Sequence, residues 1–348
     1  MADNALVTGG SGYVALGIIQ QLLAEGAKVN TTVRDLRNEA KVDPLKQLQE
    51  KYPGQLQLFE ANLLKPGTFD RAMRDCTVVF HVASAFLLPE QIKDAKLQLI
   101  DPAINGTRNV LETVNRTASV NRVVMTSTIG AIFGDYADVR QMKDEILTEE
   151  YWNTSSTPET YPYHYSKVSA EKEAWRIANA QSRWSFVTIN PGLILGPSLT
   201  RASESGSLFL LDEMMKGYFF YGQPDWWMAT VDIREAAHAH LVAAKNTAAK
   251  GRYILAEKDM ASLMDMANIL RKVHRRPWLL PRYQLPNWLV LTFGPIFGLS
   301  RRLMNTHLGI HFKLDNTRSI KELGITYRPL EQTLIDHYRS WQAFRDAR

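Results

Sequence analysis

Short apolar runs and helically spaced apolar residues take turns along the first 200 residues of the chain. Runs such as residues 77–83 and 122–126 are nearly continuous, as expected for strands that are buried on both faces. Other segments repeat apolar side chains at helical spacing. The predicted strands are residues 5–7, 28–33, 56–60, 77–83, 122–126 and 185–189, and the predicted helices are residues 13–25, 105–115, 168–178 and 231–245. This alternation favours an α/β fold with a doubly wound parallel sheet.

The pattern changes after Gly196-Pro197. Residues 197–230 and 258–316 are less regular and richer in Met, Trp and Pro, which predicts a smaller and discontinuous part of the fold. Helical spacing returns within residues 231–245. The expected division is a main domain of residues 1–196 with about 231–257, and a smaller substrate-binding part of about 197–230 with 258–348.

Composition and charge exclude several classes of protein. Of the 348 residues, 45% are hydrophobic and 22% are charged, which excludes a disordered or fibrous chain. The single cysteine, Cys76, excludes a disulfide framework and a cysteine-based zinc site, and fits a reducing compartment. Residues 261–348 carry 14 Lys/Arg and 6 Asp/Glu, but in short groups between apolar residues. We expect a solvated basic face there and no nucleic-acid partner.

No segment predicts stable membrane insertion. The longest apolar run, residues 288–300, is shorter than the roughly 20 residues that span a bilayer, and Gly294-Pro295 interrupts it. With Arg301 and Arg302 beside it, this run could lie on a membrane surface, but a helix and turn of the substrate part is the favoured interpretation. The chain starts without a basic, apolar leader. We therefore expect a cytoplasmic protein, either a monomer or a homodimer.

A glycine-rich turn follows the first predicted strand and opens the first predicted helix. It reads Thr8-Gly9-Gly10-Ser11-Gly12-Tyr13-Val14-Ala15. Glycine permits a tight turn and lets the backbone approach a pyrophosphate, while the helix N-terminus offers free N–H groups to it. The spacing is Gly9-x-x-Gly12-x-x-Ala15, which differs from the common G-x-G-x-x-G. Its place within a βαβ unit favours nucleotide binding over an ordinary turn.

The end of the second strand should contact the adenosine ribose. Enzymes that use NAD tend to place an acidic residue there to hold the 2′-hydroxyl. Here Arg34 follows the strand and can pair with a 2′-phosphate, and Lys41 adds charge nearby. Asp35 leaves an ambiguity, but the pattern favours NADP over NAD.

Candidate acid–base chemistry lies in the segment Tyr163-His164-Tyr165-Ser166-Lys167. Tyr163 and Lys167 are four residues apart at the start of a predicted helix, so both side chains share one face. A nearby ammonium favours the phenolate and moves the tyrosine pKa toward the working range. Such a pair could protonate a carbonyl oxygen. Because Tyr and Lys often stand four apart by chance, this pair needs support from other residues.

The strand at residues 122–126 ends in three hydroxyls, Thr126, Ser127 and Thr128. Open α/β sheets place their ligands at the carboxyl ends of strands. A hydroxyl here could hydrogen-bond a substrate carbonyl. The alternative is that these side chains only satisfy backbone groups at the strand end.

Taken in order, these motifs resemble the extended short-chain dehydrogenase/reductase family. The resemblance is carried by TGGSGYVA at 8–15, TVRD at 32–35, NGTRNVL at 105–111, TST at 126–128, YxxxK at 163–167 and NPGLILGP at 190–197. TVRD and the FHVAS segment at 80–84 are similar to the branch of dihydroflavonol 4-reductases and cinnamoyl-CoA reductases. The resemblance covers about residues 4–260. It implies a Rossmann-type fold and an NADPH-dependent oxidoreductase.

The resemblance also implies roles for single residues. Tyr163 would be the proton donor with Lys167 as its partner, and Asn105 would support the lysine through water. The family's catalytic hydroxyl falls at Thr128, with Ser127 before it, and which of the two acts stays open. The family's adenine-binding Asp-Leu appears here as Asn62-Leu63. With the residue patterns above, the implied cofactor contacts are Gly9, Ser11, Gly12, Tyr13, Val14, Arg34, Lys41, Asn62, Leu63, Val82, Ala83, Ser84, Thr126, Tyr163, Lys167, Pro191, Gly192 and Leu193.

The substrate is less constrained than the cofactor. Phe133 stands where the flavonoid reductases have a substrate-contacting asparagine, and Tyr161-Pro162 replaces the Asn-Trp of the lignin-pathway reductases. An apolar pocket with Phe86, Phe133 and Trp227 would suit an aromatic or bulky apolar aldehyde or ketone. Alternatives are a 3β-hydroxysteroid dehydrogenase/isomerase, a nucleotide-sugar epimerase or dehydratase, and a non-catalytic NADP-binding protein. We expect no metal site.

Overall fold

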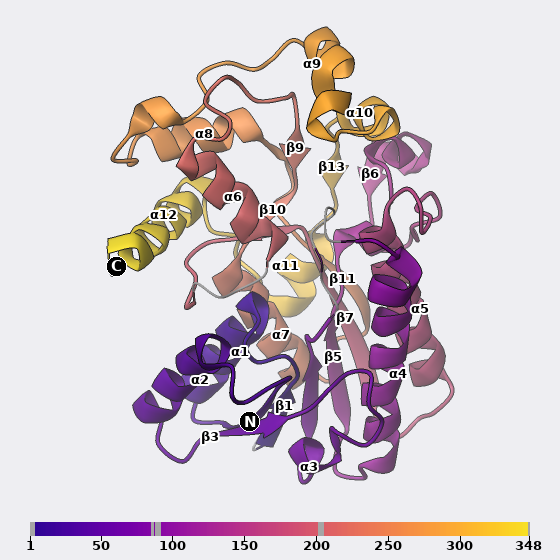
Figure 1. Ribbon diagram of the computed structural model, residues 1–348. Helices are drawn as coiled ribbons and strands as arrows, with labels where there is room; N and C mark the ends of the chain where they lie inside the picture. Colours follow the sequence, from indigo (N-terminus) through magenta and orange to yellow (C-terminus); the bar gives the residue numbers. More distant parts are fainter. Residues whose placement is uncertain (1–3, 85–86, 88–91, 201–204, 347–348) are drawn as a thin grey trace.

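The computed structural model describes residues 4–84, 87, 92–200 and 205–346, and its centre is one parallel sheet of seven strands (Figure 1). In spatial order the strands are β11 (Gly251–Leu255), β7 (Ser185–Pro191), β5 (Arg122–Thr126), β4 (Val78–His81), β1 (Asn4–Val7), β2 (Lys28–Val33) and β3 (Leu56–Glu60). Every neighbouring pair in this sheet is parallel. The doubly wound Rossmann-type sheet predicted from the sequence is therefore confirmed.

Helices cover both faces of the sheet, and each face has its own hydrophobic core. One core contains α1 (Tyr13–Ala24), α2 (Glu39–Lys51) and α7 (Ile233–Lys245). The other contains α3 (Asp70–Met73), α4 (Asp101–Arg116) and α5 (Pro162–Asn179). Successive residues of β5 alternate between them, because side chains of a strand point to opposite faces in turn: Val124 joins the first core, and Val123 and Met125 join the second.

Several elements differ in length from their predicted ranges: helix α5, for example, begins at Pro162 rather than at residue 168. Two of the differences have local reasons. Helix α4 begins at Asp101 rather than at residue 105, and Pro102 occupies one of its first two positions, where a proline costs no hydrogen bond. The strand predicted to reach residue 83 ends at His81. Beyond it, the N–H groups of Val82 and Ala83 donate to the Thr8 hydroxyl instead of continuing the ladder.

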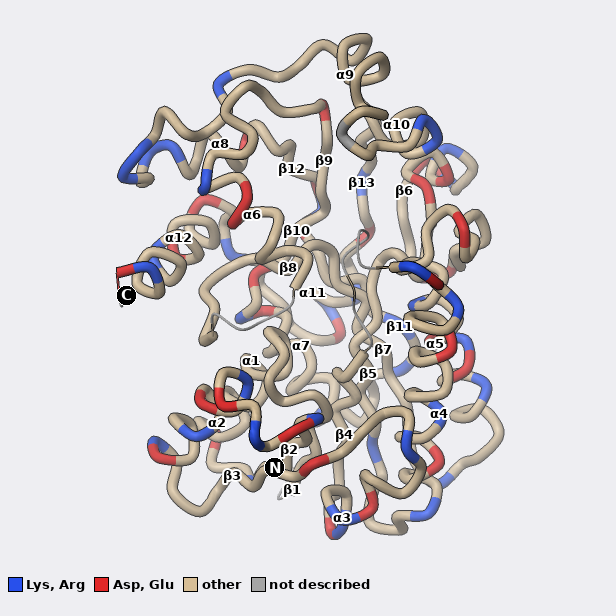
Figure 2. The backbone as a smooth tube through the Cα atoms, viewed as in Figure 1, with Lys and Arg blue, Asp and Glu red and all other residues tan. Residues whose placement is uncertain are grey.

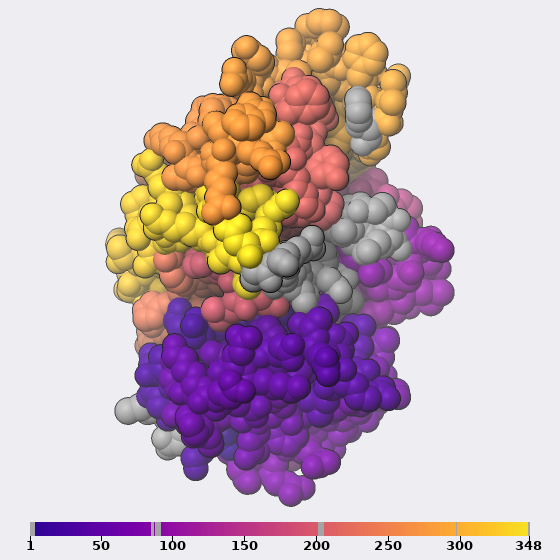
Figure 3. All heavy atoms as spheres, turned by 60° about the vertical axis from the view of Figure 1, so that its left-hand side comes forward, coloured from indigo at the N-terminus to yellow at the C-terminus, as the bar shows by residue number. Residues whose placement is uncertain are grey.

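Most of the remaining elements are short, α12 being the longest of them, and many lie beyond the carboxyl ends of the sheet strands (Figure 1). In Figure 3 the segments after about residue 260 form the upper part of the molecule, above the N-terminal residues. The short strands pair as β8 (Leu193–Leu195) with β10 (Thr230–Asp232), β9 (Trp227–Met228) with β12 (Ala261–Ser262), and β6 (Ile146–Leu147) with β13 (Lys313–Leu314). The helices are η2 (Lys96–Ile100), η3 (Ile129–Ala131), η4 (Tyr136–Gln141), η5 (Lys143–Glu145), α6 (Gly206–Lys216), α8 (Leu263–Arg271), η6 (Pro277–Leu279), α9 (Asn287–Phe293), η7 (Gly294–Phe297), α10 (Arg301–His307), α11 (Thr317–Leu323) and α12 (Leu330–Asp346).

Two further hydrophobic clusters hold this upper part together. One contains buried residues of η3 and η4 with Ile310 and Phe312. The other joins α6, α8 and α12. Helix α11 lies within the segment expected to belong to the substrate part, but it packs against β11 and α7 of the central sheet.

A buried arginine connects the start of β5 to the end of α7. The Arg122 guanidinium, at the start of β5, donates to the carbonyl oxygens of Ala243, Asn246 and Ala249, where α7 ends. Ala243 lies in the last turn of α7, where carbonyls lack a helical N–H partner, so the cation supplies donors there; the Asn246 carbonyl also accepts from the Ala249 N–H.

We predict that Arg122→Ala lowers the free energy of unfolding by about 2–4 kcal/mol, because several buried carbonyls lose their donor. Urea or thermal denaturation followed by circular dichroism measures this change. Arg116→Ala is the matched control, since Arg116 pairs with Asp70 on the surface, where both side chains are 54% exposed. Equal destabilisation by the two variants would contradict the capping role of Arg122.

Candidate active site

The turn between β1 and α1 lies against the end of β4. Gly9 has a φ of +72°, and a Cβ on it would lie 3.0 Å from the Ala83 Cα, so a larger residue is excluded on both counts. The Thr8 hydroxyl accepts from the N–H groups of Val82 and Ala83, at 3.0 Å each. This brings Gly9, Val82 and Ala83, three predicted cofactor contacts, to the same place at the carboxyl edge of the sheet.

The first turn of α1 is open to an anionic ligand. Its N-cap is Gly12, which supplies no side-chain cap to the free N–H groups. Ser11 is partly exposed in this turn. The Tyr13 side chain instead points into the fold, where its hydroxyl donates to the Gly196 carbonyl oxygen at 2.8 Å. Val14 packs against the hydrophobic core, so Tyr13 and Val14 offer a ligand their backbone groups.

The ambiguity between Arg34 and Asp35 is resolved by a neighbouring side chain. Asp35 accepts two hydrogen bonds from the Arg37 guanidinium, at 2.9 and 3.1 Å, and Arg37 lowers the pKa of that carboxyl. Arg34 is exposed at the end of β2 and forms no ion pair with any residue that the structure describes. Lys41 lies near the N-terminus of α2. The charge left without an ion-pair partner directly after β2, among the described residues, is therefore cationic.

The segment predicted to bind adenine follows β3. The Asn62 side-chain oxygen accepts from the Leu64 N–H at 2.9 Å, and the Leu63 carbonyl accepts from the Asn109 amide at 2.6 Å. A Cβ on Gly106 would lie 3.0 Å from the Leu63 Cβ, so Leu63 packs closely on α4. Ser84 is exposed beyond β4. Phe86 lies outside the described residues.

The three hydroxyls after β5 have three different surroundings. The Thr126 hydroxyl is 2.7 Å from Nε2 of His240, and because Nδ1 of His240 donates to the Ala236 carbonyl, Nε2 accepts from Thr126. The Ser127 hydroxyl is buried and donates to the carboxylate of Glu171. Thr128 is partly exposed and its oxygen accepts from the Gly130 N–H at 3.2 Å. Its hydroxyl proton is donated to no described residue, which distinguishes Thr128 from Ser127.

Tyr163 and Lys167 lie one turn apart in the first half of α5. The Lys167 Nζ is 5.8 Å from the centroid of the Tyr163 ring. Burial raises the pKa of Tyr163 to about 12, which is the opposite of the direction expected from a neighbouring ammonium. Burial also lowers the pKa of Lys167 to about 8, and the Glu171 carboxylate opposes that shift. Without ligand, the tyrosine is thus held as a neutral phenol.

The sequence analysis missed Glu171, which lies four residues after Lys167 on the same helix. Its carboxylate is fully buried and forms an ion pair with Arg252 at 2.7 Å. It also accepts hydrogen bonds from Thr188, Asn190, Trp175 and Ser127. The spacing offered a signal: Glu171 stands three and seven residues before Ala174 and Ala178, so it shares their apolar helix face, and a carboxylate buried on such a face requires donors.

A histidine links the glycine-rich turn to α4. Nδ1 of His81 is 3.2 Å from the Thr8 hydroxyl, and its Nε2 is 3.3 Å from the Thr107 hydroxyl. Burial, and then the charge of Lys167, lower the pKa of His81 to about 3, so the ring is neutral. The predicted helper Asn105 is exposed, and its side-chain oxygen accepts from Arg108 at 3.1 Å. The structure therefore places Thr107, rather than Asn105, on the buried face of α4.

The predicted substrate contacts Phe133 and Trp227 differ in how far their side chains are buried. Phe133 is 2% exposed and makes edge-to-face contacts with Tyr136, His164 and Phe312, so it belongs to an aromatic core. Trp227 is partly exposed and its ring packs on His311.

The predicted nicotinamide segment leads from the end of β7 into β8. A Cβ on Gly192 would collide with the Ala229 carbonyl oxygen, so this position requires glycine. Pro191 is buried at the end of β7, and Leu193 is partly exposed at the start of β8.

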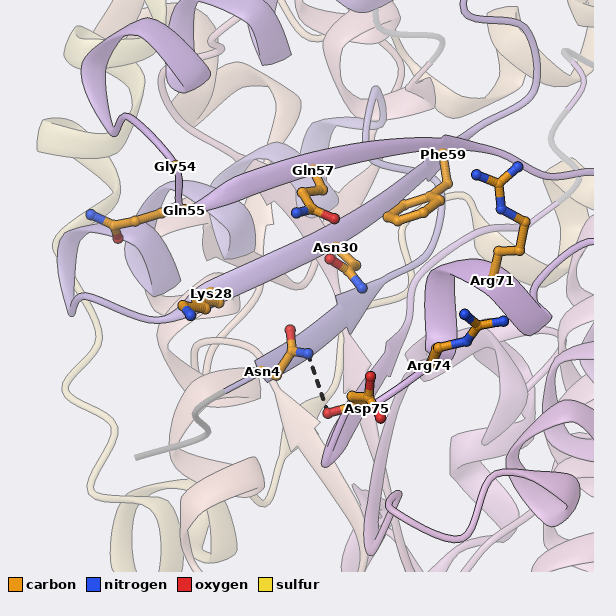
Figure 4. A pocket seen from close by; sticks show the side chains of 10 residues that line it. All are labelled: Asn4, Lys28, Asn30, Gly54, Gln55, Gln57, Phe59, Arg71, Arg74 and Asp75. Atoms are coloured by element: carbon orange, nitrogen blue, oxygen red, sulfur yellow. Dashed lines mark hydrogen bonds between the residues drawn. The ribbon is translucent and has the colours of Figure 1, made fainter.

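A cavity of about 310 Å³ lies elsewhere (Figure 4). It opens toward the amino ends of β1, β2 and β3, and the Asn4 amide donates there to the Asp75 carbonyl oxygen at 3.2 Å. Its lining residues are Asn4, Lys28, Asn30, Gly54, Gln55, Gln57, Phe59, Arg71, Arg74 and Asp75. None of them is a predicted site residue, and ligands of parallel sheets bind at the opposite, carboxyl edge.

Comparisons with known proteins agree with this arrangement. The chain is 32% identical to a cinnamoyl-CoA reductase of Medicago truncatula over 98% of this chain and 96% of that protein. It is 35% identical to an anthocyanidin reductase of Arabidopsis thaliana, covering 73% of this chain and 75% of that protein. The structure of the yeast methylglyoxal/isovaleraldehyde reductase Gre2, complexed with NADPH, matches with a TM-score of 0.81 and 26% identity over 99% of both chains. Residues 5–256 match the model of the NAD dependent epimerase/dehydratase family, and the chain belongs to that family.

Proposed function

We propose that this protein is an oxidoreductase that uses NADPH to reduce an aldehyde or ketone to the alcohol. Its relatives that are named reductases act on carbonyl-type compounds, and a protein of the same fold is known with NADPH. The observation that carries the proposal is the packing of the first turn of α5 on η3, the turn that Thr128 caps. A Cβ on Gly130 would lie 2.6 Å from the His164 ring, next to Tyr163.

The residues at the carboxyl edge of the sheet fit the cofactor. The turn at Gly9 and the uncapped first turn of α1 suit a pyrophosphate, and Arg34, without an acidic partner in the described part of the chain, suits a 2′-phosphate. When bound there, NADPH supplies the hydride that reaches the carbonyl carbon. In the proposed division of the chain, residues 1–196 with about 231–257 form the domain that binds NADPH. Residues of about 197–230 with 258–348 form the part that binds the substrate.

Three side chains of this protein would act on the substrate oxygen. Thr128 donates its free hydroxyl proton to the carbonyl oxygen and so polarises the bond. Tyr163 then transfers its phenolic proton to that oxygen, and a pKa raised to about 12 keeps this proton in place at neutral pH until negative charge develops. Lys167 lies beneath the ring and, once protonated, stabilises the phenolate that is left.

We expect Tyr163→Phe to bind NADPH normally and to lose carbonyl reduction by at least about 100-fold, because the proton donor is removed while the ring remains. Loss of NADPH absorbance with a panel of aromatic and aliphatic aldehydes and ketones measures turnover, and quenching of protein fluorescence measures binding. Turnover retained in this variant would refute the mechanism. If the wild-type chain binds NADPH but reduces no carbonyl, nucleotide sugars and steroid alcohols become the substrates to test.

Arg34→Ser should raise the KM for NADPH by about 10- to 100-fold, since a charge-assisted contact to the 2′-phosphate is lost. The KM for NADH in the same variant should stay unchanged, because NADH carries no such phosphate. Arg74→Ser provides the matched control, as Arg74 is an exposed arginine at the opposite edge of the sheet. Equal loss with both cofactors would show that Arg34 does not read the phosphate.

The two neighbouring hydroxyls should separate into a chemical and a structural role. Thr128→Val should lower kcat by about 100-fold with little change in stability, because one donor to the reacting oxygen disappears. Ser127→Ala should instead lower the free energy of unfolding by about 1–3 kcal/mol, since the buried carboxylate of Glu171 loses a donor. Steady-state kinetics and urea denaturation of both variants test this. The reverse pattern would assign the chemistry to Ser127.

A further inference from the structure

The segment α9–η7 lies at one end of the molecule, away from the central sheet (Figure 1). Trp288 is 65% exposed and Ile296 is 77% exposed, and Leu291 and Phe293 are exposed as well. Val290 is the residue of α9 that is buried. An amphipathic helix normally buries its apolar side chains against the protein, whereas α9 buries Val290 and leaves other large apolar side chains exposed.

A second group of exposed aromatic side chains lies on the neighbouring loops. The Gln223 N–H donates to the Tyr283 carbonyl oxygen at 3.0 Å, and the Leu285 N–H donates to the Gln223 carbonyl oxygen at 2.8 Å. This pairing holds the loop that carries Phe220 beside the segment that leads into α9. Phe220 is 63% exposed and Tyr283 is 70% exposed. We call Phe220, Tyr283, Trp288, Leu291, Phe293 and Ile296 the apolar tip.

The charges within the segment that carries α9, η7 and α10 have one sign. The neighbouring carboxylates Asp135 and Asp225 belong to other segments and are bonded to Arg302 and to the Trp227 indole N–H. Residues 266–314 contain eight Lys/Arg and no Asp/Glu. Of these cations, Arg276, Arg282 and Arg301 are exposed and form no ion pair with any residue in the described part of the chain. Figure 2 shows α9 itself without charged residues and blue segments on α10. The tip is thus an apolar protrusion flanked by unpaired cations.

We propose that the apolar tip docks this protein on a membrane surface that contains anionic lipids. Trp and Tyr side chains favour the interface between headgroups and acyl chains, and Lys or Arg beside them is attracted by anionic headgroups. No helix among the described residues is long and apolar enough to span a bilayer, so the tip lies in the interface. This inference does not depend on the reaction proposed above.

A second copy of the chain is a less suitable occupant of the same surface. A twofold contact places the same patch on both partners, so Arg282 and Arg301 of each copy would face cations with no carboxylate from residues 266–314 to pair with them. Like charges brought together at an interface disfavour association. An anionic lipid surface meets both the apolar and the cationic character of the tip.

The experiment is co-sedimentation of the full chain with vesicles of phosphatidylcholine alone and of phosphatidylcholine with 30% phosphatidylserine, roughly the anionic range in which electrostatic attraction is pronounced. We expect the protein to bind the anionic vesicles. Salt at 0.5 M should weaken this binding, because roughly all charge attraction beyond direct contact is screened at that concentration. No binding to either vesicle, or equal binding to both, would overturn the proposal.

Two double variants identify the part of the surface that binds the vesicles. Trp288→Ser with Ile296→Ser should weaken binding at least about tenfold, because large apolar side chains no longer enter the interface. Arg282→Glu with Arg301→Glu should weaken it by at least about 25-fold, from about fivefold for each cation. Ile320→Ser, at a side chain that is 45% exposed on α11, and Arg74→Glu are the matched controls and should bind as the wild type does.

Each variant is checked for folding by thermal denaturation, since all of these side chains are exposed and should hardly affect stability. Unchanged vesicle binding by the Trp288/Ile296 variant would overturn the proposal. Sedimentation velocity supplies the competing outcome: a concentration-dependent dimer that Trp288→Ser disperses would show that a second copy covers the tip, and would also overturn it.

Discussion

Five donors converge on the carboxylate of Glu171, and the ion pair with Arg252 at their centre is almost completely buried. A buried charge is tolerated only if its partner and its hydrogen bonds are all in place, and removing one partner of such a pair costs about 3–5 kcal/mol. The donors come from different elements: Ser127 follows β5, Thr188 and Asn190 belong to β7, Trp175 to α5 and Arg252 to β11. The position of α5 relative to three strands is therefore set by one carboxylate.

That constraint extends to the candidate chemistry. Lys167 lies one helical turn before Glu171, and Asn190 donates both to Glu171 and to the Thr128 carbonyl oxygen. The ion pair thus holds the backbone of Thr128 and the helix that carries Tyr163 in one arrangement. Neither Glu171 nor Arg252 needs to touch a substrate to affect the proposed reaction, because the two residues position the proposed catalytic groups Thr128 and Tyr163.

The sequence predicts six of the seven sheet strands and most of the covering helices, because strands buried on both faces leave continuous apolar runs and helices leave a periodic pattern. It does not predict β11, or α2, a mostly polar helix that contains Pro44. It also predicts the glycine-rich turn and the cation at Arg34. It does not reveal that the Asp35 carboxylate pairs with Arg37, since that pairing depends on side-chain conformation in an exposed loop. It cannot separate Thr126, Ser127 and Thr128 either, because their partners His240 and Glu171 are distant in the chain. The same is true of Phe133, whose burial is decided by Phe312, nearly 180 residues away.

The strict alternation at the end of β5 has a consequence for how this chain can change over evolutionary time. Thr126 faces α7, Ser127 faces α5, and Thr128 is left with a free proton at the strand end. Inserting or deleting one residue within β5 would exchange the two faces, bury a hydroxyl opposite the wrong partner and leave Glu171 short of a donor. Length variation is thus excluded from this strand. The loops within residues 280–300, between η6 and α10, contribute no donor to Glu171. These loops can therefore gain or lose residues without disturbing the sheet.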